Sequence, residues 1–153
     1  MTSIPVQLMT LCILRDGNRI LLAMKKRDFG KGNWNGYGGK LEKEESIEEA
    51  LVREVKEEST VDITKFAKRG DIFFHFADIT RHVHIYEGMK WQGEPKESEE
   101  MDPKWFSIND LPYDKMWTSD KEWYRYFLKR IPFKGDVEFD ENYKIISMDI
   151  KEV

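Results

Sequence analysis

The segment GGKLEKEESIEEALVREVKEESTV, residues 38–61, decides how the rest of this sequence is interpreted. It carries eight glutamates together with the isoleucine, leucine, valine and alanine that a helix needs for packing. Ser46 followed by Glu49 forms a capping box, so we expect a helix that begins after Ser46 and runs to about Glu58. The direction of each glutamate around this helix decides whether it is solvated or functional.

Two of these glutamates fall on the apolar stripe of the predicted helix. At about 100° per residue with Glu54 at zero, the stripe is centred near about 35° and Glu58 lies near about 40°. Glu57 lies at about 300°, near the edge of the stripe. The other charged residues fit a solvated face: Glu48, Glu49 and Lys56. Two or three carboxylates therefore face the protein body.

Inward carboxylates need a compensating charge. One helical turn apart, about 5–6 Å, two of them repel by roughly 3 kcal/mol at an effective dielectric near 20, and burial adds a hydration cost. Arg53 could pair with Glu57, but it projects at about 260° and cannot neutralise Glu54 and Glu58 alone. Oxygen ligands without nearby Cys or His favour Mg²⁺ or Mn²⁺. The alternative is a paired or protonated cluster with a structural role.

Most other segments have the composition of β-strands. Residues 8–15 and 19–26 flank Asp16-Gly17-Asn18, a turn sequence that joins paired strands. Residues 27–40 carry five glycines, which suits a loop and a short strand whose backbone can approach a ligand. Further strands are expected at residues 70–76, 82–89 and 103–107 and in a closing hairpin at residues 133–153.

A second helix is expected over residues 120–130. Ser119 followed by Glu122 is predicted to cap it, and Pro132 ends it. Because no repeat or long linker divides the 153 residues, the sequence predicts one α/β (α+β) domain over residues 1–153.

Composition narrows the possible functions. With 35% charged residues and a net charge of only −4, the chain has no large field of one sign that would favour a nucleic acid polymer or a membrane. The apolar run near the N-terminus is interrupted by Gln7 and Thr10, which argues against a signal peptide or membrane span, so we expect a cytoplasmic protein. The single cysteine, Cys12, lies in an apolar strand and is expected to be a buried thiol.

The spacing of the glutamates resembles the Nudix box. The fixed residues of that pattern are matched in order and spacing by Gly39, Glu45, Arg53-Glu54-Val55, Glu57-Glu58 and Val61. One position departs, because Thr60 occupies the place of a glycine that normally eases the turn leaving the helix.

The resemblance to one branch of this family, the mammalian-type MutT homologues, covers nearly the whole chain. It rests on Thr10, residues 24–30, 34–40, 70–76, 82–84, 97–106 and 115–117, Asp120, Trp123 and the C-terminal hairpin. The resemblance implies the Nudix fold, a curved mixed β-sheet sandwiched between helices. It also implies Mg²⁺-dependent hydrolysis of a nucleoside triphosphate, here 8-oxo-dGTP to 8-oxo-dGMP and pyrophosphate, which removes oxidised nucleotides from the pool.

The same resemblance assigns roles to individual residues. The acids that match metal ligands are Glu54, Glu57, Glu58 and the loop residue Glu100, with the carbonyl of Gly38 or Gly39. Arg53 matches the residue that holds the glutamates, and Lys25 a position near the phosphates. The residues that match the purine pocket are Thr10, Phe29, Asn35, Phe74, Trp117 and Asp120. Water attack at the β-phosphorus is implied, with Glu58, Glu57 or Glu100 as the proton acceptor.

A second departure concerns the purine pocket. The branch carries two adjacent aspartates where this chain has Ser119-Asp120. A serine cannot supply a titrating carboxyl, so the range of oxidised purines is left open.

We expect a monomer that acts on a small-molecule nucleotide. Three other interpretations compete with hydrolysis of 8-oxo-dGTP. The chain could instead hydrolyse another nucleotide, such as another purine triphosphate or a nucleotide sugar, or it could be a module that binds a nucleotide without cleaving it. Alternatively, His82 and His84 could bind a transition metal from one strand face, an interpretation that lacks a third ligand in the sequence.

Overall fold

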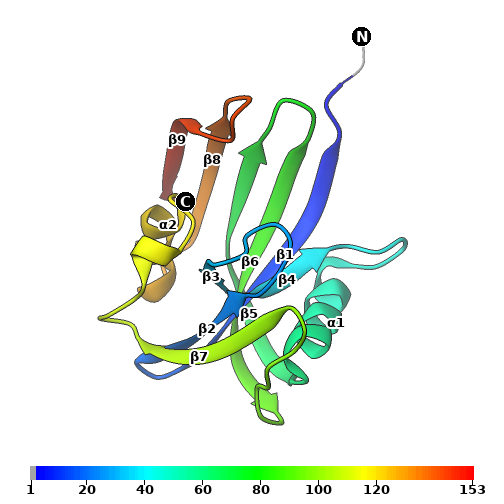
Figure 1. Ribbon diagram of the computed structural model, residues 1–153, viewed down its shortest axis with the longest axis vertical. Helices are drawn as coiled ribbons and strands as arrows, with labels where there is room; N and C mark the ends of the chain where they lie inside the picture. The colour runs from blue at the N-terminus through cyan, green and yellow to red at the C-terminus, as the bar shows by residue number, and fades with distance from the viewer. Residues whose placement is uncertain (1–2) are drawn as a thin grey trace.

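A mixed β-sheet forms the centre of the computed structural model, which describes residues 3–153 (Figure 1). The nine strands of this described range are β1 (Val6–Asp16), β2 (Arg19–Lys25), β3 (Trp34–Asn35), β4 (Tyr37–Lys40), β5 (Asp62–His75), β6 (Thr80–Gln92), β7 (Met101–Ser107), β8 (Phe133–Phe139) and β9 (Ile145–Glu152). The sheet order is β3-β2-β1-β6-β5-β8-β9, with β4 also paired to β1 and β7 to β2. The pairs β1–β6 and β5–β8 are parallel, and the remaining pairs are antiparallel.

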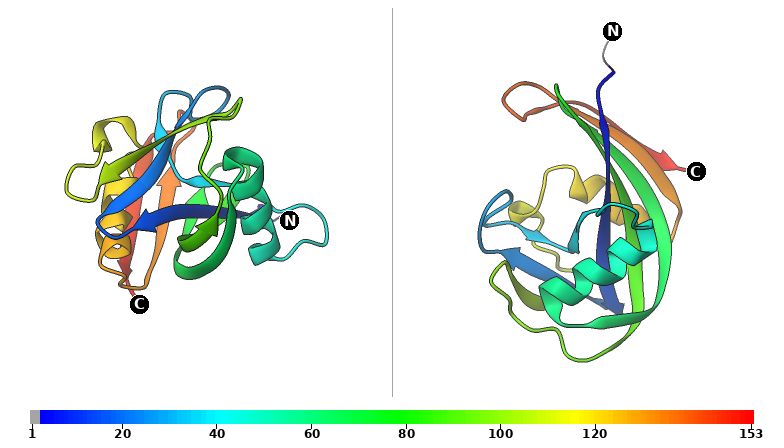
Figure 2. Two further views of the ribbon diagram at one scale, coloured as in Figure 1. Left: turned by 90° about the horizontal axis from the view of Figure 1, so that it is seen from below. Right: turned by 90° about the vertical axis from the view of Figure 1, so that its right-hand side faces the viewer.

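The two helices cover opposite faces of this sheet. Cys12 and Leu14 of β1 pack with α1 (Ile47–Ser59), whereas Ile13, between them, packs with α2 (Asp120–Leu128). This alternation follows from the two-residue period of side chains along a strand. Figure 2 shows the curvature of the sheet and the helices on its two sides. The predicted α+β fold, a curved mixed sheet between helices, is confirmed.

The capping box predicted for the first helix is present. Ser46 Oγ accepts the Glu49 N–H at 3.1 Å, and the Glu49 carboxylate accepts the Ser46 N–H at 2.9 Å. These two bonds satisfy backbone donors that the helix itself leaves unpaired. The helix ends at Ser59, and its C-cap Thr60 has left-handed backbone angles with φ 69°.

The central strands are much longer than predicted. The strand expected at residues 70–76 is β5, which begins at Asp62, and the strand expected at residues 82–89 is β6, which runs to Gln92. Residues 62–69 alternate apolar and charged side chains only irregularly, because bulges shift the register near Lys65 and Lys68. A bulge breaks the period-two pattern by which a strand is identified in a sequence.

The predicted cap of the second helix is wrong. Ser119 has helical angles, φ −74° and ψ −18°, and its hydroxyl makes no capping hydrogen bond. The Trp117 N–H donates instead to Asp120 Oδ2 at 3.2 Å. The carboxylate one position further along therefore holds this turn, and α2 stops at Leu128.

Cys12 is a free thiol buried in the core on the α1 side, as predicted. Burial raises the pKa of this thiol to about 12, with a smaller contribution from Glu87, so it is not a nucleophile at neutral pH. Within residues 3–153, neither helix has the length and apolar composition needed to cross a bilayer.

Thr60→Gly is expected to raise the free energy of unfolding by about 1 kcal/mol, because a β-branched residue is strained at a left-handed C-cap that glycine adopts freely. Urea unfolding measures the change. As a control, Glu48→Gly on the exposed side of the same helix should lower the unfolding free energy by about 1 kcal/mol. An unchanged or lowered stability of Thr60→Gly would mean that the Thr60 Oγ to Glu94 carbonyl bond, 3.3 Å long, outweighs the strain.

Candidate active site

Two adjacent glycines allow the backbone of β4 to approach its neighbours closely. A Cβ on Gly38 would lie 1.9 Å from the Thr10 carbonyl oxygen of β1, and a Cβ on Gly39 would lie 2.7 Å from Glu54 Oε1 of α1. Neither position has room for a side chain. The Gly38 N–H donates to Glu58 Oε1 at 2.8 Å, so this strand and helix are joined at the carboxylates.

The inward direction predicted for the helix glutamates is present in the structure. Glu58 is 8% exposed and the Glu54 side chain is 16% exposed, whereas the Glu57 side chain is 56% exposed. Burial raises the pKa of Glu58 to about 8, although the Gly38 N–H acts in the opposite direction. Burial also raises the pKa of Glu54. Glu58 is thus the acid of this helix that loses most hydration.

Arg53 organises the acids on the outer side of the helix. Its Nε and Nη2 donate to the two oxygens of Glu45 at 2.7 and 2.9 Å, and Nη1 donates to Glu54 at 2.8 Å. The hydrogen bonds from Arg53 lower the pKa of Glu45 to about 2. The sequence predicted a pair with Glu57, which forms at 3.3 Å, but it did not predict the direct contact with Glu54. Within the described chain Glu58 has no cationic partner within salt-bridge distance.

Lys25 and Glu100 bring the loop before β7 to the same region. Lys25 Nζ lies 3.2 Å from Glu100 Oε2, and the Lys26 N–H donates to the Glu100 carbonyl at 2.8 Å. The hydrogen bond from Lys25 is the main reason why the pKa of Glu100 is lowered. Glu100 lies close enough to Glu58 to raise its pKa, so the predicted loop acid is near the helix acids.

The donor set of this region suits a hard divalent cation. Glu54, Glu57, Glu58 and Glu100 offer only oxygen atoms, and the charge of buried Glu58 has no partner among the described residues. In the part of the chain that is described, no three of these carboxylates have oxygens within 4.8 Å of one another. They are therefore too widely spaced for three of them to bind one ion directly without side-chain movement. Such spacing fits Mg²⁺, which keeps several of its water ligands.

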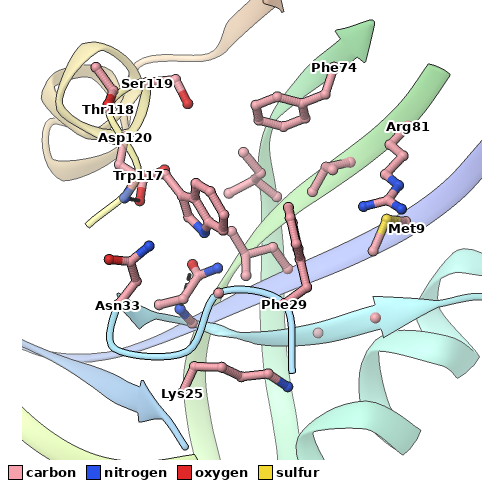
Figure 3. A pocket seen from close by; sticks show the side chains of 18 of the residues that line it. Met9, Lys25, Phe29, Asn33, Phe74, Arg81, Trp117, Thr118, Ser119 and Asp120 are labelled. Carbon is pink, nitrogen blue, oxygen red and sulfur yellow. Dashed lines mark hydrogen bonds between the residues drawn. The ribbon is translucent and has the colours of Figure 1, made fainter. Parts of the chain in front are cut away.

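A cavity of about 650 Å³ lies between Trp117 and Asp120 on one side and Arg81 on the other (Figure 3). All the residues predicted to bind substrate line it: Thr10, Lys25, Phe29, Asn35, Phe74, Trp117 and Asp120. Gly38, Gly39 and Glu58 also line it, whereas Arg53, Glu54, Glu57 and Glu100 do not. One cavity therefore connects the predicted purine pocket with one end of the acidic cluster.

The buried carboxyl of Asp120 also lines this cavity. Asp120 is 4% exposed, and its two oxygens accept hydrogen bonds from the Trp117 N–H at 3.2 Å and the Trp123 Nε1–H at 3.1 Å. Burial raises the pKa of Asp120 to about 7, against the effect of these two bonds. Ser119 is 3% exposed and also lines the cavity. The neighbouring Asn35 is oriented by the Gly36 N–H, which donates to Asn35 Oδ1 at 2.8 Å.

The two aromatic rings expected to hold a purine contact each other. Phe29 and Trp117 are stacked with ring centroids 5.1 Å apart and an angle of 28° between them. This separation leaves no room for a base between the rings. Phe29 is 61% exposed and covers one face of the Trp117 ring. A base would therefore stack on the free face of one ring or displace Phe29.

Sequence reasoning missed several residues that line the cavity, and the most notable is Arg81. Its guanidinium lies 5.8 Å from the centre of the Phe29 ring and 5.4 Å from that of Phe76. Its Nε is buried without a hydrogen-bond partner among the described residues. Figure 3 shows it across the cavity from Trp117 and Asp120. The other missed residues include Met9, Asn33, Phe139, Tyr143, Lys144 and Ile145.

The sequence pattern of β6 could have identified Arg81 as a cavity residue. Arg81, Val83 and Ile85 are every second residue of β6, so the two-residue period of a strand predicts that they share a face. All three line the cavity. The contribution of the C-terminal hairpin had no such signal, because it depends on the pairing of β8 with β5, which are distant in the sequence.

Comparison with known proteins identifies the family. The NUDIX domain model matches residues 6–127. The chain is 40% identical to the "Oxidized purine nucleoside triphosphate hydrolase" of Danio rerio and 38% identical to that of Mus musculus, in each case over 96% of both chains. The fold is similar to the crystal structure of a MutT protein from Bacillus halodurans, with a TM-score of 0.83, 24% identity and coverage of 95% of this chain and 97% of that one. With the family model and two such relatives covering most of its length, the chain belongs to the Nudix family and is a Nudix hydrolase.

Proposed function

We propose that this chain, acting over residues 1–153 as one monomeric cytoplasmic domain, hydrolyses 8-oxo-dGTP to 8-oxo-dGMP and pyrophosphate with Mg²⁺. The observation that carries the proposal is that one cavity is lined both by Asp120, from the predicted purine pocket, and by Glu58, from the acidic cluster. The names of the two relatives, which refer to oxidised purine nucleoside triphosphates, support the choice of substrate.

The acidic cluster supplies the groups that phosphoryl transfer needs. Glu54, Glu57 and Glu58 would hold Mg²⁺ together with Glu100 and a β4 carbonyl, and the bound ion supplies charge neutralisation and lowers the pKa of its water. Arg53 fixes the rotamer of Glu54 through its hydrogen bond.

Glu58 is the best placed of the three candidate proton acceptors. Glu57 is more than half exposed and Glu100 is paired with Lys25, whereas Glu58 lines the cavity. The Gly38 N–H holds Glu58 Oε1, which leaves Oε2 for a water molecule. In the proposed step, the water oxygen bonds to the β-phosphorus as the bond from that phosphorus to the α–β bridging oxygen breaks. Glu58 accepts the proton of the water, and the bridging oxygen leaves with the nucleoside monophosphate.

The predicted purine pocket supplies the groups that recognise the base. The Asp120 carboxylate can accept the N–H donors of the guanine edge, and Asn35 offers an amide whose oxygen is already held by the backbone. Because both groups are fixed by internal hydrogen bonds, a base that leaves them unpaired is penalised. Lys25 and Arg81 place two cations along the same cavity, where a polyanionic substrate needs them.

The proposed substrate is tested by pyrophosphate release from 8-oxo-dGTP, dGTP, 2-oxo-dATP and a nucleotide sugar, each with Mg²⁺ and with a chelator. We expect a kcat/KM for 8-oxo-dGTP at least about tenfold above that for dGTP, since one discriminating hydrogen bond is worth more than about 1.4 kcal/mol. Equal rates for 8-oxo-dGTP and dGTP would disprove the substrate. Turnover that persists in the chelator would disprove the metal dependence. If no nucleotide is hydrolysed, the chain is a module that binds a nucleotide without cleaving it, and the proposed activity is disproved.

Glu58→Gln is expected to lower kcat about 10²–10⁴-fold, because the amide keeps the size of the side chain but cannot accept the proton. Thermal unfolding should show that the fold survives. The matched control is Glu48→Gln, which changes an exposed acid of the same helix and should leave kcat unchanged. Near-normal turnover of Glu58→Gln would remove Glu58 from the chemical step.

Asp120→Asn is expected to remove a pH dependence of substrate binding. Because the pKa of Asp120 is raised to about 7, the carboxyl is protonated below that pH and accepts the N–H groups of the base only above it. The KM for 8-oxo-dGTP should therefore fall as the pH rises through about 7 in the wild type. It should be about tenfold higher and free of this transition in the variant.

Stability gives an independent check of the same pKa. A carboxyl with a raised folded-state pKa contributes stability below its unfolded pKa, about 4, which is lost as the pH rises through about 7. The wild type should therefore lose stability relative to Asp120→Asn across this window in urea unfolding. Parallel pH curves for the two proteins would show that Asp120 titrates normally.

A further inference from the structure

All three histidines of the chain lie on one face of the β5–β6 pair: His75, His82 and His84. His82 and His84 alternate on β6 with Val83 and Ile85, which line the nucleotide cavity. Since side chains alternate between the two faces of a sheet, His82 and His84 point away from that cavity. Any function of these histidines is therefore separate from the binding of the nucleotide base.

Asp71 completes a group of three possible metal ligands. It lies directly opposite His84 in the β5–β6 register, and its Oδ1 is 2.9 Å from His82 Nε2 and 3.1 Å from His84 Nδ1. All three ligand atoms lie within 4.8 Å of one another. A tetrahedral ion with bonds of about 2.0–2.1 Å holds its ligands roughly 3.3 Å apart. The distances from Asp71 to both imidazoles are close to this spacing.

A cation already sits beside two of these ligands. Lys68 Nζ lies 2.7 Å from Asp71 Oδ1 and 2.9 Å from His84 Nδ1. Lys68 reaches the cluster from the bulge between Lys68 and Gly70. Its side chain is 39% exposed, against 24% for Asp71 and 12% for His84. The ligands are therefore fixed in the sheet, while the lysine has a flexible stem that can move its ammonium into solvent.

We propose that Asp71, His82 and His84 form a second metal site, which binds one zinc-like divalent ion in competition with the ammonium of Lys68. Two imidazoles and one carboxylate favour Zn²⁺ and related transition metals, whereas the oxygen-only glutamate site favours Mg²⁺. Water or the second Asp71 oxygen completes the coordination.

The surroundings separate the ligands from the third histidine. The Phe73 ring stacks on His82 with centroids 4.0 Å apart, which restricts the orientation of that imidazole. His75 instead pairs with Asp136 of β8, with Nε2 2.7 Å from Oδ1. His75 is thus a matched control: it is on the same face and the same strand pair but outside the ligand set.

The site is tested by titrating Zn²⁺ into the metal-free full-length chain in excess Mg²⁺, with bound zinc measured by equilibrium dialysis and Co²⁺ absorption used to detect nitrogen ligation. We expect one equivalent of zinc in the wild type and an affinity at least about tenfold lower in His84→Ala and Asp71→Asn. His75→Ala should match the wild type. Lys68→Met should bind zinc roughly fivefold more tightly, because a partly exposed lysine pair is worth up to about 1 kcal/mol.

Two further measurements distinguish this site from general effects of the substitutions. Zinc should raise the Tm of the wild type and of Lys68→Met but not that of His84→Ala. Mg²⁺-dependent hydrolysis should be unchanged in all four variants, which also confirms that they fold. Equal zinc affinity of wild type and His84→Ala, or no zinc bound by Lys68→Met, would overturn the proposal. Loss of the zinc equivalent in Glu58→Gln would also overturn it, by assigning the ion to the glutamate site.

Discussion

The contact between the glycine backbone of β4 and the carboxylates of α1 is the constraint on which this structure depends. Gly38 lies too close to the Thr10 carbonyl of β1 for any side chain, and its N–H donates to Glu58. Gly39 has no side chain, and Glu54 occupies the space that one would need. The helix is thereby held with two acids turned toward the sheet. Arg53 of the same helix pairs with Glu54, but Glu58 has no cationic partner among residues 3–153, and Glu58 also lines the cavity.

Basic side chains balance most of the acids that the fold buries or crowds together. Arg53 pairs with Glu45 and Glu54. Lys25 pairs with Glu100, and Lys68 pairs with Asp71. The nearly buried Glu87 of β6 is paired with Arg69 and Arg130. Glu58 is different, since among residues 3–153 it has only a backbone donor and no cation in contact. This asymmetry explains why the acidic cluster suits a divalent ion, and why one end of it remains available to the cavity.

The two faces of the sheet carry different chemistry. On the face toward α2, residues of β1, β5 and β6 line the cavity, among them Leu11, Phe74 and Val83. On the opposite face, β5 carries Asp71 and β6 carries His82 and His84. The nitrogen-rich ligand group is built from β5 and β6, whereas the oxygen-rich one is built mainly from α1, so the two groups differ in donor atoms and each can select its own type of ion.

The sequence by itself determined what depends on local periodicity and on short spacings. The capping box at Ser46, the inward direction of Glu54 and Glu58 and the burial of Cys12 follow from patterns within one element. The curved sheet between helices was instead implied by the family resemblance. The residues that the resemblance assigned to the purine pocket all line one cavity, which Glu58 also lines.

Only the tertiary structure decided the contacts between elements that are distant in the chain. Asp71 becomes a partner of His84 through the register of a long bulged hairpin, and the closing hairpin reaches the cavity through the pairing of β8 with β5. The tertiary structure also decided that the Ser119 hydroxyl makes no capping hydrogen bond and that Phe29 stacks on Trp117. The physical reason is that periodicity fixes the face on which a side chain lies, whereas register, bulges and curvature fix what that face meets.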